Sequence, residues 1–424
     1  MNTGYALITR NILQRLQTQY NWDCYNLGHN YVGQKIQNLK FADGSKIDFT
    51  LLGVPPQPPE IRIPYAKDLI LPYIDRLKVD AFGILLDLFM TNGWLQNMHI
   101  PTNTFFYFPS DGGQVVPDNA FEYYREFFTP EQMKDYLEFI ETGILPLGCA
   151  DILQKMKRSV AMSKFGQRQA WKVHGIKTDY IPHGVDVDIF FPLPSEGKKE
   201  LKNKVVVMSC TGALLQGALK NKFVVGVVGR NQGRKMHDRA IKAFAFFAKN
   251  KPDAVLLLHL DPYDIASPFN IIEYIKFLNI HNKVFFTGMK WFDGFSTYDL
   301  RNVYNTFDVY FSSSSGEGFG ICSIEALACG IPAILPDYTS TYELLVENGR
   351  CGEPVLMNDV LLGTWNVPRG IMSIPDAVHK LNKLYYDAKL RDHYSKVGLK
   401  KIQEYYDWNV IMPQWDKFLK ELTT

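Results

Sequence analysis

Short continuous apolar runs alternate with longer amphipathic stretches along most of this 424-residue chain. In the first half the runs lie at 80–87, 104–108 and 159–163, and a helical pattern follows from Lys164 to about His174. Because these runs are continuous and do not alternate with polar residues, we expect strands covered on both faces. Strands that alternate with helices predict a parallel, doubly wound α/β sheet.

A second α/β series fills the other half of the chain. Its apolar runs lie at 224–228, 254–258, 284–286, 309–311 and 332–335. Between the two series, 190–203 is rich in proline, lysine and glutamate, and we interpret it as the linker. The pattern therefore predicts two Rossmann-like, doubly wound domains, 1–192 and 193–406, that face each other across a cleft. Ligands of such sheets bind beyond the carboxyl ends of the strands.

The beginning of the chain departs from this pattern. Asn2 to Tyr5 resembles the glycine loop that follows a first strand, and 6–20 resembles the helix after it. The strand itself is missing. Two interpretations stay open: the sequence is truncated here, or the sheet lacks that strand.

Composition narrows the class of protein. There are 46 Lys+Arg and 44 Asp+Glu, a net charge of +2, which argues against a nucleic-acid coat or a polybasic membrane anchor. The six cysteines contain no CxxC pair, and we interpret them as reduced, apolar residues. Without an 18-residue apolar stretch or a signal peptide, we expect a cytoplasmic protein, and loose contact with a membrane stays open.

The strongest motif is the stretch 315–332, which reads SGEGFGICSIEALACGIP. A strand is expected to end near Phe311, and a short helix to begin near Gly320. Glycines expose backbone N–H groups, and the helix N-terminus adds partial positive charge, so the turn can seat a diphosphate. Glu317 in the turn and Glu325 in the helix can accept hydrogen bonds from sugar or ribose hydroxyls. The alternative for each is an exposed glutamate beside a packing turn.

A second motif, GRNQGRKMHDR at 229–239, lies at a strand-to-helix turn. Arg230 and Lys235 are five residues apart across the turn, and both can converge on one point, where fixed cations would stabilise a phosphate leaving group. We interpret Arg234 and Arg239 as solvated surface charges. The dinucleotide fingerprint GxGxxG is absent.

These residues resemble those of a known family, the retaining glycosyltransferases of the GT-B fold, GT4 type. Glu317 and Glu325 match its E-x7-E motif, and Arg230 and Lys235 its G-R-x-x-x-x-K turn. The run IPHGVD at 181–186 resembles its segment near the end of the first domain. The last helix, within 407–424, resembles the one that crosses back to that domain.

The resemblance implies the role of each residue. Glu317 would hold hydroxyls of the donor sugar and Glu325 the ribose, while Arg230 and Lys235 would bind the diphosphate. Other donor-binding positions would be Gly229, Thr287, Gly318, Phe319 and Gly320. Gly4 and Tyr5 would lie on the acceptor side. The donor would be a nucleotide-sugar, with no other cofactor and no metal. The run Asp186-Val187-Asp188 matches the Asp-x-Asp metal motif in sequence, but it falls in the segment beside the hinge between the domains.

One position departs from the family pattern. Where many relatives carry a first-domain histidine, this chain has Asp111, which either supports the reacting carbon or caps a turn. His183 is the alternative histidine, and a structural role is open for it. An aromatic cluster at Tyr123, Tyr124, Phe127 and Phe128 could be core or could stack on an acceptor sugar.

The expected function is therefore transfer of a sugar from a UDP- or GDP-sugar to an acceptor hydroxyl, with retention. The acceptor could be a glycan, lipid, protein or modified nucleic acid. Alternatives are a sugar epimerase or phosphorylase on the same fold, or a non-catalytic nucleotide-sugar or glycan binder. The oligomeric state is open.

Overall fold

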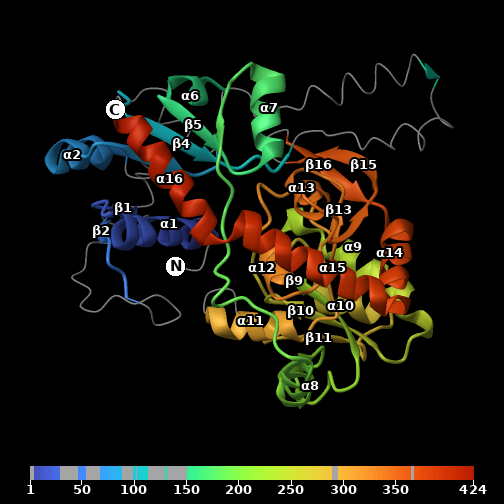
Figure 1. Cartoon of the computed structure of the whole chain (residues 1–424). Coiled ribbons are helices and arrows are strands. Elements are labelled where there is room, and N and C mark those ends of the chain that lie inside the picture. The colour runs from blue at the N-terminus through green and yellow to red at the C-terminus, as the bar shows by residue number, and fades with distance from the viewer. Residues whose placement is uncertain are drawn as a thin grey trace.

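The computed structural model describes residues 4–28, 46–53, 67–87, 99–101, 103–112, 129–130, 150–288, 295–363 and 367–424 (Figure 1). The first domain is built on a parallel sheet of order β3-β4-β5-β6. Its strands are β3 (Phe82–Leu85), β4 (Thr104–Phe108), β5 (Arg158–Ala161) and β6 (Asp179–Tyr180). A separate parallel pair joins β1 (Tyr25–Gly28) to β2 (Thr50–Gly53).

Four described helices belong to this domain. They are α1 (Gly4–Tyr20), α2 (Lys67–Leu77), α6 (Ala150–Lys155) and α7 (Lys164–His174). The side chain of Ser163 caps α7 by accepting a hydrogen bond from the Gly166 N–H at 3.0 Å, which explains why the helix begins where its apolar pattern does.

The second domain contains an eight-stranded sheet of order β14-β13-β12-β9-β10-β11-β7-β8. The first six strands in this order are parallel, and β7 and β8 add an antiparallel edge. The strands are β7 (Val206–Ser209), β8 (Leu214–Gln216), β9 (Phe223–Val228), β10 (Ala254–His259), β11 (Val284–Phe286), β12 (Val309–Phe311), β13 (Ala333–Pro336) and β14 (Gly352–Val355). Every residue of β9 to β13 is buried, as their continuous apolar sequences predict.

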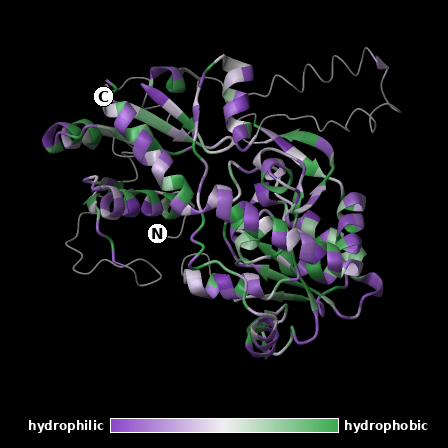
Figure 2. Cartoon of the chain, in the orientation of Figure 1, coloured by the Kyte–Doolittle hydropathy of each residue, from purple (hydrophilic) through white to green (hydrophobic). Residues whose placement is uncertain are grey.

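Helices surround this sheet, and all of them except α8 bury apolar residues against the rest of the domain (Figure 2). They are α8 (Ser195–Lys204), α9 (His237–Phe247), α10 (Ile271–Phe277), α11 (Thr297–Asn305), α12 (Ile321–Ala328), α13 (Ser340–Val346), α14 (Ile374–Tyr386) and α15 (Ala388–Lys401). A hairpin of β15 (Met357–Leu362) and β16 (Pro368–Met372) lies beside the sheet. Short turns of other helix types occur at Gly233–Lys235, Ala248–Asn250 and Ile402–Tyr406.

The last helix, α16 (Trp408–Thr423), returns to the first domain (Figure 1). Trp415 is buried against the rings of Tyr107 and Phe105 on β4. Arg158 on β5 pairs with Glu421 at 3.0 Å. The chain therefore crosses between the domains twice, and the Val185 N–H donates to the Tyr406 carbonyl at 2.7 Å where the two crossings meet.

Two predicted elements need correction. The supposed linker 190–203 contains most of helix α8, which has no buried residue, so its Lys/Glu-rich sequence carries no apolar stripe that would have revealed it. Gly4 and Tyr5 lie in the first turn of α1 and do not form a loop, while Asn2 and Thr3 fall outside the described residues.

Other predictions meet the structure only in part. In the described portion α1 is the first element, with no strand before it. The aromatic cluster at 123–128 and Cys149 lie outside that portion, and the five cysteines within it are free. None of the described helices has the length and apolar character needed to cross a bilayer. The domain boundaries stay predictions.

Candidate active site

The glycine-rich turn between β12 and α12 packs directly on the first domain. A Cβ added at Gly316 would lie 1.8 Å from the carbonyl oxygen of Asp111, and one at Gly318 would lie 2.5 Å from Cβ of Pro109. Gly320, the residue before α12, has a φ of +101°, which favours glycine. These glycines therefore allow the two domains to meet at the N-terminus of α12.

Glu317 in this turn binds two cations. The Lys235 ammonium contacts one carboxylate oxygen, and Nη1 of Arg234 lies 3.1 Å from the other. The Glu317 side chain is only 12% exposed. Burial alone would raise its pKa, but the charges of Lys235 and Arg234 outweigh burial and lower the pKa to about 2. Glu317 is therefore ionised at every physiological pH.

Serine side chains fix the cations at this position. The carbonyl of Arg234 accepts hydrogen bonds from the Ser315 N–H at 2.8 Å and its hydroxyl at 2.9 Å. The Ser313 hydroxyl is within hydrogen-bond distance of the Lys235 and Met236 carbonyls, at 2.9 and 2.7 Å. Sequence reasoning missed this contribution, although a run of four serines directly after a buried strand, at 312–315, was the available signal.

The cations themselves differ from the prediction. Arg234, interpreted as a surface charge, meets Lys235 at Glu317, and it also donates to the Gly316 carbonyl at 3.3 Å. Arg230 donates through Nε to Asp264 at 2.7 Å, so the expected convergence of Arg230 with Lys235 is replaced by that of Arg234 with Lys235. Arg239, also interpreted as solvated, donates to the Met372 carbonyl at 2.6 Å.

Glu325 lies further along α12 and is 4% exposed. The Tyr304 hydroxyl donates to its Oε2 at 2.7 Å. Burial raises the pKa of Glu325 to about 7, and the hydrogen bond from Tyr304 offsets only part of this effect. The pKa values of the two glutamates are therefore shifted in opposite directions. Two cations surround the ionised Glu317, whereas a neutral hydroxyl contacts Glu325.

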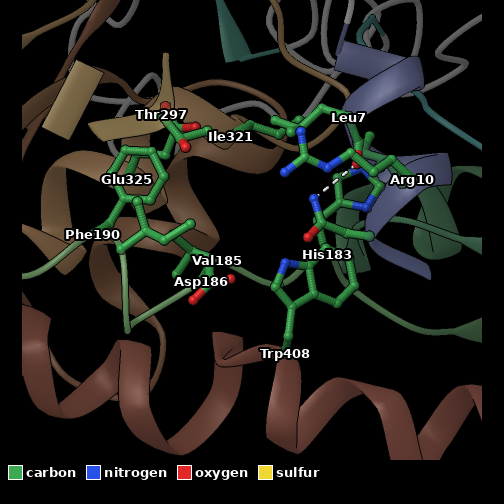
Figure 3. A pocket seen from close by; sticks show the side chains of 14 residues that line it. Leu7, Arg10, His183, Val185, Asp186, Phe190, Thr297, Ile321, Glu325 and Trp408 are labelled. Atoms are coloured by element: carbon green, nitrogen blue, oxygen red, sulfur yellow. Dashed lines mark hydrogen bonds between the residues drawn. The ribbon is translucent and has the colours of Figure 1, made fainter. Parts of the chain in front are cut away.

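Glu325 lines a pocket between the domains (Figure 3). Thr297 and Ile321 of the second domain share its wall with Leu7 and Arg10 of α1. Other lining residues come from the crossing segments, namely His183, Gly184, Val185, Asp186, Ile189, Phe190 and Trp408.

His183 is buried in this wall and stays neutral. Its Nδ1 lies 2.7 Å from the Tyr107 hydroxyl, and its ring packs edge-on against Phe319 of the glycine-rich turn at 4.7 Å. Burial lowers its pKa to about 3. His183 therefore has a clear structural role, and it also faces the pocket.

The remaining predicted positions spread around the cleft. Asp111 pairs with Arg369 of the second domain at 3.0 Å. The Thr287 hydroxyl lies 2.9 Å from Nδ1 of His259, and a Cβ added at Gly229 would lie 3.7 Å from Cδ and Cε of Lys235. The Tyr5 hydroxyl donates to the Asp87 carboxylate.

Asp186, the first residue of the metal-like spelling, accepts from Arg15 at 3.0 Å and from the Asp188 N–H at 3.1 Å, which are structural contacts. Among the described residues, no group of three or more His, Cys, Asp or Glu could hold a metal ion.

Comparison with known proteins identifies this arrangement. Residues 216–399, which include Glu317, Glu325 and the two cations bound to Glu317, match the family model described as glycosyl transferases group 1. The match lies within the second domain and covers less than half of the chain. Over 170 residues the chain is 26% identical to mannosylfructose-phosphate synthase of Agrobacterium fabrum, covering 38% of this chain and 34% of that protein. The chain spans a third to a half of the length of the curated relatives that it matches.

Solved structures show that the chain has the GT-B fold. Sucrose-phosphate synthase from Thermosynechococcus elongatus superposes with a TM-score of 0.68 at 17% identity, covering 99% of this chain and 94% of that one. Anabaena HepE in complex with UDP and glucose superposes with a TM-score of 0.58 at 16% identity, covering 88% and 86%. The prediction of two facing α/β domains is therefore confirmed.

Proposed function

We propose that this protein is a retaining glycosyltransferase that moves a sugar from a UDP- or GDP-sugar to an acceptor hydroxyl. The observation that carries the proposal is Glu317, largely buried and ionised between Lys235 and Arg234, in the glycine-rich turn that opens α12. Such a site offers an acceptor for sugar hydroxyls next to donors for a diphosphate. The crystal structure of Anabaena HepE, which has a similar fold, contains UDP and glucose, and this supports a nucleotide-sugar donor.

The charges of the cluster suggest how a donor enters. Glu317 carries one negative charge and its two partners carry two positive charges, so the cluster retains net positive charge. Sugar hydroxyls donating to Glu317 would replace the contacts that Lys235 and Arg234 make with it. The freed cations would then turn to the diphosphate, and Glu317 would be held by the sugar hydroxyls.

Catalysis in this scheme rests on stabilising the leaving diphosphate. Lys235, Arg234 and the backbone N–H groups at 318–320 would face the negative charge that grows as the bond to the anomeric carbon breaks. The acceptor hydroxyl attacks on the same face of the sugar, and the departing phosphate oxygen takes its proton. Arg230 would release its contact with Asp264 and bind a phosphate oxygen of the diphosphate. Glu325 would accept a hydrogen bond from a ribose hydroxyl.

We place the acceptor on the first-domain side of the cleft, near Asp111 and Tyr5. Their partners, Arg369 and Asp87, make this edge polar. Asp111 would stand beside the reacting carbon. As the sequence analysis does, we propose a cytoplasmic protein. The acceptor classes stay those given there, namely a glycan, lipid, protein or modified nucleic acid, and loose contact with a membrane stays open.

A donor panel tests the proposal. The protein is incubated with UDP-glucose, UDP-galactose, UDP-N-acetylglucosamine and GDP-mannose, with and without a mixture of glycan acceptors, and nucleotide release is measured. The proposal expects release of UDP or GDP from at least one donor, and an anomeric configuration retained in the product. Tight binding of a donor without release would indicate a binding protein, and neither binding nor release would contradict the proposal.

A further inference from the structure

The segment that leads from β13 into α13 fixes the backbone of the glycine-rich turn. The Glu317 N–H donates to the hydroxyl of Thr339, the residue before α13, at 3.1 Å. The Ser340 hydroxyl lies 2.7 Å from the Glu317 carbonyl oxygen and 2.9 Å from that of Phe319. Thr339 and Ser340 are 2% and 0% exposed, so water does not compete for these contacts. Both backbone polar groups of Glu317 are therefore bound by this segment.

Thr339 adopts a backbone conformation that is unusual for its residue type. Its φ is +55° and its ψ is −134°. Glycine adopts a positive φ freely, whereas a β-branched side chain crowds the backbone there. Strain of this kind persists only where the surrounding structure enforces it, and strained residues cluster at functional sites. A glycine at 339 would relieve the strain, but it would leave the Glu317 N–H without its acceptor.

Hydroxyl contacts within the segment enforce this conformation. The Thr339 hydroxyl donates to the Tyr338 carbonyl at 2.7 Å while it accepts from the Glu317 N–H. The Thr341 hydroxyl lies 2.6 Å from the carbonyl oxygens of Pro336 and Tyr338. Because its own proton is directed to a carbonyl, the Thr339 hydroxyl presents a lone pair to the Glu317 N–H in one fixed orientation.

We propose that Thr339 is a positioning residue of the active site, which keeps the Glu317 carboxylate aimed at the donor sugar. The inference rests on the proposed function, in which Lys235 and Arg234 leave Glu317 for the diphosphate. Once these cations turn away, the place of the carboxylate depends on how firmly its backbone is bound, and Thr339 and Ser340 provide that binding. A small misplacement of a group that orients the reacting sugar lowers the rate strongly.

Three substitutions at Thr339 separate positioning from stability. Thr339→Val removes the hydroxyl and keeps the β-branched strain, so the melting temperature should fall and kcat should fall by about tenfold or more. Thr339→Gly removes the hydroxyl and the strain together, so it should melt above Thr339→Val while its kcat falls by a similar factor. Thr339→Ser keeps the hydroxyl, and its kcat should be within about twofold of wild type. All are measured with the donor that the wild type turns over.

Hydrogen exchange adds a readout that does not require turnover. The Glu317 amide should be protected in the wild type and in Thr339→Ser, and its protection should fall by about tenfold or more in the valine and glycine variants. Thr306→Val is the matched control, because it removes another buried hydroxyl, which donates to the Val303 carbonyl at 2.7 Å. It should lower the melting temperature without changing kcat or the exchange of the Glu317 amide.

Wild-type kcat in both Thr339→Val and Thr339→Gly would overturn the inference while leaving the proposed function intact. A kcat that recovers in Thr339→Gly together with the melting temperature would also overturn it, because Thr339 would then act through stability alone. Unchanged protection of the Glu317 amide in both variants would show that Thr339 does not fix the turn. If the wild type released nucleotide from no donor, the proposed function itself would fail, and this inference with it.

Discussion

At the scale of single residues, the two glutamates of one motif are distinguished by their surroundings. Glu317 lies between cations, which lower its pKa, whereas Glu325 lies among neutral groups, where burial raises its pKa. The sequence placed Glu317 in the turn and Glu325 in the helix that follows, but it could not supply these partners. Arg234 was missed because adjacent charges in a turn look alike in a sequence, and only the serine contacts decide which of them turns inward.

Loss of either side of the Glu317–Lys235 pair should slow transfer severely. We expect Glu317→Gln and Lys235→Met each to lower kcat by about 10²- to 10³-fold, since each removes a contact to the reacting groups. Steady-state kinetics with the active donor measures this, and thermal melts establish that each variant is folded. Lys276→Met, which removes an exposed lysine on α10, is the control. Full activity in either site variant would show that its assigned role is wrong.

The raised pKa of Glu325 should appear in the pH dependence of stability. An acid with a folded-state pKa of about 7 and an ordinary value of 4.5 stabilises the fold below the ordinary value, and this contribution is lost as pH rises through 7. Thermal melts should therefore show wild type losing stability relative to Glu325→Gln between about pH 5 and pH 8. A difference independent of pH would mean that Glu325 titrates normally.

At the scale of elements, apolar runs identified the buried strands well because burial on both faces leaves little room for polar residues. Strands β4, β9, β10 and β11 lie within a residue of their predicted runs. Helix α8 was missed because it buries nothing, so no periodic stripe marks it. Elements held by packing could therefore be predicted, and an exposed helix could not.

Helix α16 should be essential to the first domain. Trp415 is 1% exposed and packs on Tyr107, Phe105 and Phe418, so Trp415→Ala should lower the free energy of unfolding by about 3–5 kcal/mol. Val410→Ala on the same helix removes a side chain that is 37% exposed and should cost far less. Urea denaturation measures the free energy of unfolding of both variants. Equal costs would mean that α16 packs less tightly than described.

At the scale of the whole molecule, two α/β series predicted two facing domains, and the structural comparisons confirm this fold. The contacts between the domains could not be predicted, because they join residues far apart in sequence. Glu343 on α13 accepts from the N–H groups of Lys164 and Phe165 at 3.1 and 2.9 Å, thereby capping a helix of the other domain. The close approach of Gly316 to the backbone of Asp111 is a second contact between the domains that joins residues far apart in sequence.

Disrupting these contacts should open the cleft. In Gly316→Ala the new methyl group would collide with backbone of the other domain, and in Glu343→Ala the contact between α13 and the first turn of α7 is lost. We expect both to increase the radius of gyration measured by small-angle X-ray scattering. Gly197→Ala, whose new Cβ would have only ordinary contacts at 3.7 Å and beyond, is the control. Scattering identical to wild type for both variants would contradict the described closure.

The central claim is that the N-terminus of α12 seats the diphosphate of a sugar donor. A crystal structure with bound UDP or GDP tests it most directly. The account predicts phosphate oxygens within hydrogen-bond distance of the backbone N–H groups at 318–320 and of Lys235, with the ribose at Glu325. Nucleotide bound elsewhere, with Glu317 still closed on Lys235 and Arg234, would contradict it.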